Sequence, residues 1–442
     1  MQDRGNRRDF LERASATVVA ASALHQSAVQ DAAAQGGTGS NRKLVVGLIG
    51  CGGRGLHVAR LFQRTPQVEL GYLCDVDQQR REAAARGLGI DGSRVFADLR
   101  RLLDIRQVDA VIVATPDHWH SPASVLACDA GKHVYVEKPI SHNIREGRLL
   151  VDASARNKTL IQHGTQCRST RMMIEAVRLI REGLIGDCLV AKCWNVQRRS
   201  SIGKGQETAP PAHLDYDNWI GPAPMIPYRT NRVHNRWTWW YHFGAGDMGN
   251  DGVHDLDYTR WGLGVETHPT RISAHGGKFF FDDDQEFPDT QQVTFEYPGD
   301  GKVGSQRLLI YEQRLWSTNY PHHCDSGAEF HGTKGLMFLS RRGKLTVRGE
   351  RNAPVEVDVE PQGQDDLTHV ANFCAAIRGT APLTADALTG HLSTSLCHLG
   401  NIATRLQRTL TFDPEHEQFV NDAEANDLVR REYREHWGTP IG

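Results

Sequence analysis

The sequence predicts an α/β protein in which a doubly wound parallel sheet is followed by a second domain built around a meander-like sheet. In the first part of the chain, short apolar runs alternate with helical stretches, as in a parallel sheet whose strands are joined by helices. A glycine-rich loop directly follows the first of these runs. In the second part, β-branched or alternating runs follow one another, separated by turn signals such as PGDG and RRG.

The composition is that of a folded protein that recruits neither nucleic acid nor membranes. The 442 residues suffice for two or three domains, and a content of 39% hydrophobic and 24% charged residues suits a globular chain. A formal net charge of −2 provides no field that would attract nucleic acid or an anionic membrane. Beyond the N-terminus, no run approaches the ~20 apolar residues that span a bilayer. The nine cysteines show no CxxC pair or zinc-like spacing, so we expect buried thiols and no metal site.

Residues 1–40 are predicted to be a twin-arginine export signal and linker. Arg7 and Arg8 are followed by Phe10, Leu11 and a short apolar run rich in Ala and Thr. This run is too weak to remain in a membrane. We therefore expect the folded protein to be exported to the periplasm, and the segment is excluded from the prediction of the fold.

Residues 41–165 are predicted to form a domain that binds a dinucleotide. The apolar run LVVGLI is typical of a strand buried on both faces, and the loop GCGGRG and a helical stretch follow it. Gly50 permits the tight turn, Gly52 lets the backbone approach a pyrophosphate, and Gly55 allows close packing of helix and strand. The helix N-terminus favours the negative charge of the phosphates. The loop residues expected to contact the cofactor are Gly50, Cys51, Gly52, Gly53, Arg54 and Gly55.

The end of the second predicted strand indicates which dinucleotide is bound. The run VELGYLCDVD places Asp75 there, where a carboxylate can hydrogen-bond a ribose 2′-OH and would repel a 2′-phosphate. NAD is therefore the expected cofactor. Arg80 and Arg81 lie close by in the sequence and leave NADP open.

Two later predicted strands end in polar motifs at the edge of the sheet where ligands of such sheets bind. VDAVIVATP leads into ATPDHWH, and HVYVEKP ends in Glu137-Lys138-Pro139. A Glu-Lys pair is usually an ordinary surface feature, but its place at the carboxyl end of a strand and before a proline indicates a functional role. The residues of these motifs expected to contact the cofactor are Thr115, Pro116, His118, His120, Glu137 and Lys138.

With these motifs the chain resembles the glucose–fructose oxidoreductase/inositol dehydrogenase (Gfo/Idh/MocA) family. The shared features are GCGGRG, ATPDHWH, EKP and the later block GAGDMGNDGVHDLD, whose combined order is specific. The resemblance covers residues 43 to about 412. It implies a Rossmann domain followed by an α/β domain with an open, mostly antiparallel sheet, and a homo-oligomer, dimer or tetramer. It also implies oxidation or reduction of a sugar or cyclitol hydroxyl with bound NAD(P).

The resemblance also implies roles for single residues. By position, Lys138 matches the active-site lysine of the family and His254 matches its catalytic histidine. Many sugar dehydrogenases of the family have an aspartate four residues before that histidine, whereas this chain has Asn250. An amide can orient a hydroxyl but cannot take its proton, so the Asp–His dyad is not expected in its usual form. The acidic residues nearby that could substitute are Asp247, Asp251, Asp255 and Asp257.

Residues 166–412 are predicted to bind the substrate, and residues 413–442 are predicted to be a C-terminal tail. Between Arg199 and Trp240 the chain is rich in Pro, Gly and Trp and has no clear period. Aromatic faces stack on sugar rings, so we expect at least one of Trp237, Trp239 and Trp240 to face the cleft; the alternative is that they are core or interface residues. The substrate-binding candidates are Trp237, Trp240, Asp251, Tyr320, His322 and His323, with His391 and His398 on a later predicted helix.

Three functions remain open at this stage. In the first, NAD accepts a hydride while His254 acts as general base and Lys138 holds the hydroxyl and stabilises the developing oxyanion. The second follows from export, because a cofactor that is not replenished must be reoxidised in place. It is a redox-neutral glycosidase that forms a 3-keto sugar, eliminates the aglycone, adds water and reduces the ketone. The third is a sugar-binding protein without catalysis, which Asn250 favours and the intact EKP and His254 oppose.

Overall fold

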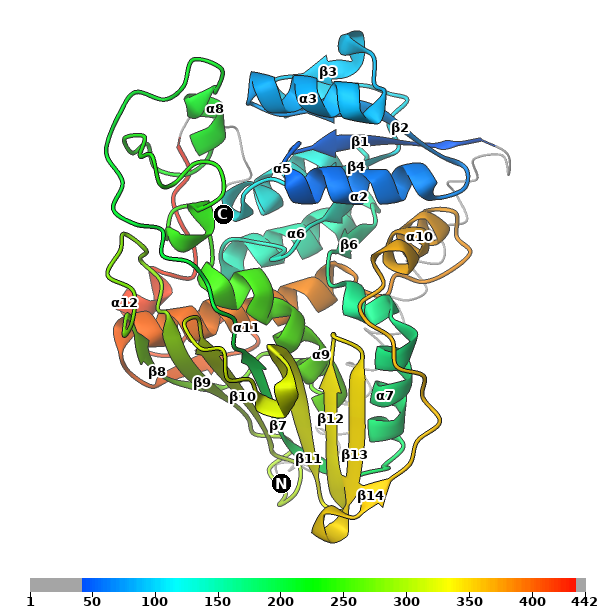
Figure 1. Cartoon of the computed structure of the whole chain (residues 1–442), viewed down its shortest axis with the longest axis vertical. Helices are drawn as coiled ribbons and strands as arrows, with labels where there is room; N and C mark the ends of the chain where they lie inside the picture. Colours follow the sequence, from blue (N-terminus) through cyan, green and yellow to red (C-terminus); the bar gives the residue numbers. More distant parts are fainter. Residues whose placement is uncertain (1–41, 435–442) are drawn as a thin grey trace, which may run out of the picture.

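Two β-sheets lie toward opposite ends of the molecule, with helices between them (Figure 1). The structure is a computed structural model and describes residues 42–434. The predicted export signal over residues 1–40 lies outside this range. The first sheet and its helices come from the beginning of the described chain, and the second sheet comes from its later part.

The first sheet contains six parallel strands in the order β3-β2-β1-β4-β5-β6. This is the strand order of a Rossmann domain, in which the direction of winding changes between β1 and β4. Strand β4 is buried throughout, as expected for a strand covered by helices on both faces. The predicted doubly wound sheet is therefore confirmed. Its elements are β1 (Leu44–Ile49), α2 (Gly53–Arg64), β2 (Val68–Cys74), α3 (Gln78–Leu88), β3 (Val95–Phe96), α4 (Leu99–Leu103), β4 (Ala110–Val113), α5 (Asp117–Asp129), β5 (His133–Val136), α6 (Ile144–Asn157) and β6 (Ile161–His163).

The second sheet contains ten strands in the order β14-β13-β12-β11-β7-β10-β9-β8-β15-β16. Among these strands, β10 and β7 pair in parallel and the other neighbours are antiparallel. Alternate residues of β9 are buried, which is typical of a sheet with one covered face. The predicted second domain with a mostly antiparallel sheet is therefore confirmed. Its strands are β7 (Cys188–Asn195), β8 (Arg271–Gly277), β9 (Thr290–Tyr297), β10 (Arg307–Arg314), β11 (Ser326–Gly332), β12 (Gly335–Ser340), β13 (Lys344–Gly349), β14 (Pro354–Val355), β15 (Leu410–Asp413) and β16 (Gln418–Phe419).

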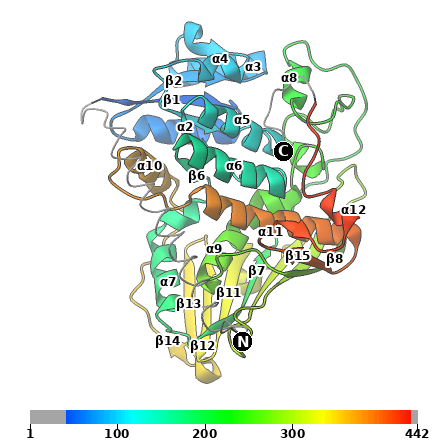
Figure 2. The same ribbon diagram turned by 180° about the vertical axis from the view of Figure 1, so that it is seen from behind.

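Helices of the second domain cover one face of its sheet, and α11 also packs against α6 of the first domain (Figure 2). The side chains of Leu396 and Ile402 on α11 belong to the core above this sheet. Within residues 42–434, no helix has the length and apolar character needed to cross a membrane. The remaining helices are α7 (Arg171–Arg181), α8 (Tyr216–Ile220), α9 (Val253–Leu263), α10 (Asp366–Ile377), α11 (Ala387–Leu406) and α12 (Ala423–Asn426), with a π-helix η4 (Met248–Gly252) directly before α9.

The chain returns twice to the first domain after leaving it. Phe373 of α10 packs against Phe62 of α2, with ring centroids 6.1 Å apart. Near the end of the described chain, Arg431 donates a hydrogen bond to Glu146 of α6. The sequence indicated only a tail from residue 413 onward, whereas β16, α12 and these contacts lie in that segment. Segments from the later part of the chain therefore pack on the first domain.

Candidate active site

A cleft of about 320 Å³ opens at the carboxyl ends of β1, β2, β4 and β5. The glycine-rich loop forms one wall, and Asp75, Thr115 and Lys138 stand along the ends of the strands. Residues of the second domain, among them Trp237 and Asn250, complete the lining. The cleft thus lies where open parallel sheets bind their ligands, and both domains build it.

The glycine-rich loop has the shape that a pyrophosphate requires. Gly50 has a φ of +97°, and a Cβ there would lie 2.5 Å from the carbonyl oxygen of Ala114. A Cβ at Gly55 would lie 2.0 Å from the carbonyl oxygen of Gly50, so only glycine lets α2 approach β1 so closely. The N-terminus of α2 has no side-chain cap and no acidic residue in its first turn. Gly52 and Gly53 line the cleft and a Cβ at Gly53 would meet nothing within 4 Å, so the start of α2 has room for an anion.

Two further groups fit a bound dinucleotide. The Asp75 carboxylate accepts hydrogen bonds from the backbone N–H groups of Cys51 (2.7 Å) and Asp77 (2.9 Å), which fixes it at the rim of the cleft. Burial raises its pKa, but these two donors oppose the shift. On the cleft wall, the buried Thr115 Oγ1 has no hydrogen-bond partner among the described residues. A ligand that offers polar groups here would satisfy it.

Glu137 and Arg54 connect the glycine-rich loop to the end of β5. The Arg54 Nε donates to Glu137 at 2.8 Å, and its Nη1 donates to Asp366 at 2.8 Å. Although burial opposes the charge of Arg54, both carboxylates raise its pKa. The guanidinium therefore remains charged and holds the loop against the strand that carries Lys138. Both residues also line the cleft, as the sequence predicted for cofactor contacts.

Lys138 is held by the second domain. Its Nζ donates to the backbone oxygen of Asn250 at 2.6 Å and to the Asn250 side-chain oxygen at 2.8 Å. The Asn250 amide nitrogen in turn donates to Asp247 at 3.0 Å, which fixes the amide so that its oxygen faces the lysine. A lysine ammonium has three N–H donors, and two of them are used here. The third is left for a ligand in the cleft.

His254 is buried on α9, and its surroundings favour the neutral form of the ring, which has one N–H and one acceptor nitrogen. Burial lowers the pKa of the ring well below its ordinary value, and the charges of Arg341 and Lys138 lower it further, whereas Asp251 opposes the shift. Its Nδ1 is buried without a hydrogen-bond partner among the described residues. A neutral ring with an unpaired nitrogen can accept a proton, as a general base must.

Asp251 is the carboxylate that acts on this histidine. It accepts a hydrogen bond from Arg341 at 3.0 Å and also pairs with Arg199. Burial raises its pKa, but Arg341, Lys138 and Arg199 overcome this effect and lower it. Asp251 therefore stays ionised.

The other three aspartates are engaged elsewhere. Asp247 accepts hydrogen bonds from Asn195 at 2.8 Å and from Arg199 at 2.8 Å. The hydroxyl of Tyr258 donates to Asp255 at 2.6 Å, and burial raises the pKa of Asp255 to about 7. Asp257 accepts from Arg168 at 2.8 Å and from Ser393 at 2.6 Å.

Several residues predicted to contact the cofactor also have structural partners. The Cys51 Sγ is buried and donates to the carbonyl of Cys74. His118 is fully buried among Trp219 and Phe243, and burial lowers its pKa to about 3. His120 lines the cleft, but both ring nitrogens lie against backbone carbonyls, at 2.6 and 2.9 Å. Pro116 lines the cleft as predicted.

The predicted substrate residues divide in the same way. Trp237 lines the cleft, which agrees with the expectation that one tryptophan would do so. Trp240 is buried in an aromatic cluster with Arg232 over its ring. The remaining candidates are not among the residues that line the cleft, because they lie at the short 3₁₀ helix η5 (Pro321–His323) before β11 or on α11. These are Tyr320, His322, His323, His391 and His398.

Other lining residues were missed from the sequence. The buried Asp117 accepts from the backbone N–H of Ala245, and burial raises its pKa well above the usual value. It lies within ATPDHWH, but nothing in the motif distinguishes it from a helix-starting aspartate. Asn218, His234 and Asn235 come from the segment without periodic pattern, so no sequence rule could place them. Only the length of the connection between Arg199 and Trp240, which has no periodic pattern, indicated that this segment is functional.

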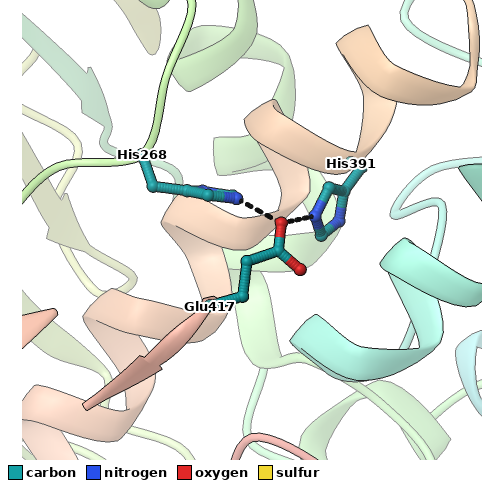
Figure 3. A group of neighbouring side chains, drawn as sticks. All are labelled: His268, His391 and Glu417. Carbon is teal, nitrogen blue, oxygen red and sulfur yellow. Dashed lines mark hydrogen bonds and ion pairs between the residues drawn. The ribbon is translucent and has the colours of Figure 1, made fainter. Parts of the chain in front are cut away.

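Away from the cleft, Glu417 lies between His268 and His391 (Figure 3). Glutamate Oε1 is 2.9 Å from His268 Nε2 and 2.7 Å from His391 Nε2. These are residue types that bind metals, and the sequence spacing did not reveal the group. However, Arg148 donates to the same oxygen at 2.6 Å and to Oε2 at 3.2 Å. Three side chains with four N–H donors converge on one carboxylate, so the group is a charge-assisted anchor for the end of the chain.

Comparisons with known proteins identify the kind of enzyme to which these features belong. Residues 44–165 match a family model described as "Oxidoreductase family, NAD-binding Rossmann fold", and residues 193–439 match "Oxidoreductase family, C-terminal alpha/beta domain". Inositol 2-dehydrogenase 4 of Saccharopolyspora erythraea is 30% identical over 365 residues, which cover 82% of this chain and 93% of that protein. An alpha-N-acetylgalactosaminidase of Shewanella oneidensis is 30% identical over 156 residues, 33% of each chain. The structure of levoglucosan dehydrogenase with NADH and levoglucosan has a TM-score of 0.65 at 18% identity and covers 84% of this chain and 99% of that one, which supports the fold.

The Glu417 anchor can be tested by stability. Glu417→Gln removes the charge that Arg148, His268 and His391 share, and we expect the free energy of unfolding to fall by about 3 kcal/mol. Thermal or urea unfolding measures this, and Glu415→Gln, two residues away and exposed, is the matched control. Treatment with EDTA should leave the melting temperature of the unaltered protein unchanged. A loss on chelation that zinc restores would show that the group holds a metal and would overturn the assignment.

Proposed function

Because the chain belongs to the Gfo/Idh/MocA oxidoreductase family, which binds NAD through its Rossmann domain, we propose that its substrate is a sugar or cyclitol oxidised at a secondary hydroxyl. The similarity to an inositol dehydrogenase supports this substrate class. The observation that carries the proposal is the remaining N–H donor of Lys138 in the cleft, whose charge also acts on the neutral ring of the buried His254.

The cofactor site is formed as the motifs predict. The backbone of the glycine-rich loop and the N-terminus of α2 would hold the pyrophosphate, and Asp75 would accept the ribose hydroxyl. Thr115 would meet the end of the dinucleotide that lies nearer to Lys138. When bound, the nicotinamide supplies the acceptor for the hydride.

The residues at the open end of the cleft would move the proton. Lys138 donates its third N–H to the substrate hydroxyl and stabilises the negative charge that develops on its oxygen. His254 accepts the proton because its low pKa keeps the ring neutral. Asp251 stabilises the imidazolium that forms, since its charge is the one that raises the pKa of this ring. Asn250 positions Lys138 and takes no proton.

A redox-neutral glycosidase is the second candidate. The similarity to an alpha-N-acetylgalactosaminidase favours it, although that similarity covers one third of each chain. The same Lys138 and His254 would serve the first oxidation and the last reduction, because both act at the same hydroxyl position, while elimination and hydration take place at the neighbouring carbons. A sugar-binding protein without catalysis would have no use for a neutral histidine with an unpaired nitrogen beside a lysine donor.

The expected location and assembly remain predictions. Export by the twin-arginine route rests on residues 7–20, which lie outside the described chain. The expected homo-oligomer follows from the family resemblance.

The two candidate functions are separated by one assay on the purified protein. We expect free sugars or inositols to reduce the nicotinamide held by the protein, with NAD added to fill empty sites, and the NADH formed on the protein is measured at its absorbance band. Release of the aglycone from an aryl glycoside without added NAD and without net NADH would establish the glycosidase instead. If the denatured protein releases no nicotinamide and the native protein binds none, both readings are wrong.

The role of His254 is tested by substitution and by pH. His254→Ala should lower kcat by roughly 10²- to 10⁴-fold, the usual contribution of a general base, while the Kd for NAD stays unchanged. The exposed His331→Ala is the control. Because the folded pKa of His254 is depressed, the base stays active below the usual histidine range of about 6.5. The kcat/KM for oxidation should therefore stay level through that range and decline only at lower pH. An acid limb at or above the ordinary histidine pKa, or full activity of His254→Ala, would remove this residue from the mechanism.

A further inference from the structure

A segment of the second domain forms the outer wall of the cofactor cleft. We call residues 213–243 the cover segment. It contains α8, which lies beside the Rossmann sheet in both views although the surrounding chain belongs to the other domain (Figures 1 and 2). Within the cleft, it supplies Asn218, Trp219, His234, Asn235 and Trp237.

The cover segment is attached to the side of the cleft that carries Asp75. Val76, which directly follows Asp75, accepts a hydrogen bond at its carbonyl from the backbone N–H of Asp215 at 3.2 Å. The backbone N–H of Gln78 donates to the carbonyl of His213 at 2.9 Å. The buried Asp77 carboxylate accepts from His234 Nε2 at 2.8 Å. The segment is therefore bound where the ribose of the adenosine half is expected.

The cover segment is also attached to the opposite side of the cleft, at α5. The Trp119 indole donates to the carbonyl of Trp219 at 3.1 Å, and His118 Nε2 lies 2.9 Å from the same oxygen. Gly221 has a φ of +55°, and a Cβ there would lie 2.2 Å from the Trp119 ring. The contact is thus too close for any side chain. The residues of the segment that line the cleft, such as Asn218 and Trp237, are therefore held from both sides.

The cover segment is packed as a unit. Tyr216, Trp219, Trp239, Trp240 and Phe243 belong to one hydrophobic cluster, which Ile202 and Leu315 of the second domain also join. Because these side chains are buried together, single residues cannot move away without exposing apolar surface. We therefore expect the segment to move as a unit if the cleft opens.

The end of the described chain holds the segment in place. The Arg434 Nε donates to the carbonyl of Gly221 at 2.8 Å, and its Nη1 donates to Asp217 at 2.9 Å. Arg431 donates to the carbonyl of His118 at 2.7 Å and to Glu146 at 2.8 Å. Residues 431–434 thus connect α8 to α5 and α6, and Glu417 anchors the beginning of the same stretch.

We propose that the cover segment, held by Arg431 and Arg434, retains the dinucleotide in the cleft through turnover, so that the enzyme works with a resident cofactor. Release of the dinucleotide then requires the attachments on both sides of the cleft and the contacts of Arg434 to break together. Charge-assisted hydrogen bonds of this kind contribute more than neutral ones and slow such opening. The inference rests on the cofactor cleft and not on the identity of the substrate, so it is tested without turnover.

The test uses the full-length protein loaded with NADH. Trp119, Trp219 and Trp237 line the cleft, so energy transfer from tryptophan to bound NADH reports occupancy. After gel filtration, the unaltered protein should keep its nucleotide, and mixing with excess NAD should release NADH slowly. Arg434→Ala should release it about 10- to 100-fold faster, which corresponds to the loss of charge-assisted hydrogen bonds. The exposed Arg430→Ala is the matched control and should release NADH at the unaltered rate.

A second variant guards against misfolding. Gly221→Ala forces the cover segment away from Trp119, displaces the carbonyl that Arg434 holds while leaving the Arg434 side chain in place, and should also speed release. Circular dichroism and the melting temperature show which variants are folded. The proposal is overturned if the unaltered protein loses its nucleotide during gel filtration, or if folded Arg434→Ala or, where that variant does not fold, Gly221→Ala releases NADH at the unaltered rate. A protein that retains NADH but oxidises no sugar would contradict the proposed substrate and leave the retention intact.

Discussion

The two hydrogen bonds from Lys138 to Asn250 are the interaction on which the active site depends. Lys138 stands at the end of β5 in the first domain, and Asn250 lies in the π-helix η4 of the second. Further contacts hold both partners. Glu137, next to Lys138, accepts a hydrogen bond from Arg54, and the Asn250 amide donates one to Asp247. The ammonium therefore has one defined place, and it has that place only when both domains are in contact. Short π-helical turns often occur at functional sites, and this one presents both oxygens of a single residue to the lysine.

The charges around that lysine determine which group can accept a proton. Arg341 and Lys138 oppose a further positive charge on His254, and burial acts in the same direction. Asp251 is the carboxylate that opposes this effect, but Arg199 and Arg341 already pair with it. The ring is consequently neutral before the reaction, and a developing oxyanion would be stabilised by the same positive groups. An aspartate at position 250 would instead place a second carboxylate next to Asp247, where the amide now donates a hydrogen bond. The asparagine thus belongs to a consistent arrangement of charges.

The parts of the structure that follow a periodic or glycine-dependent rule could be predicted from the sequence. The strand order of the Rossmann sheet, the turn at Gly50 and the placement of Lys138 depend on local residues and on the topology of parallel sheets. The cover segment could not be predicted, because its course is determined by contacts with distant α5 and with the end of the chain. His118 shows the limit clearly. It lies in a motif at the correct edge of the sheet, yet its ring is enclosed by Trp219 and Phe243 from the cover segment. Position in a motif predicts proximity to the ligand, but not the direction of a side chain.

A resident cofactor would restrict the chemistry that the site can perform. A reduced nicotinamide that does not leave must return its hydride in the same cleft, so the groups that remove a proton from a hydroxyl must also give one back. His254 suits both directions, because its neutral ring accepts a proton and the adjacent cationic groups favour its return. Lys138 serves both as well, since a donor that stabilises an alkoxide also polarises a carbonyl. A second substrate, or a later step on the same sugar, then completes the cycle. The cover segment and the unpaired histidine thus favour reactions with two opposite half-reactions at one hydroxyl position, whether the net product is an exchanged pair of sugars or a cleaved glycoside.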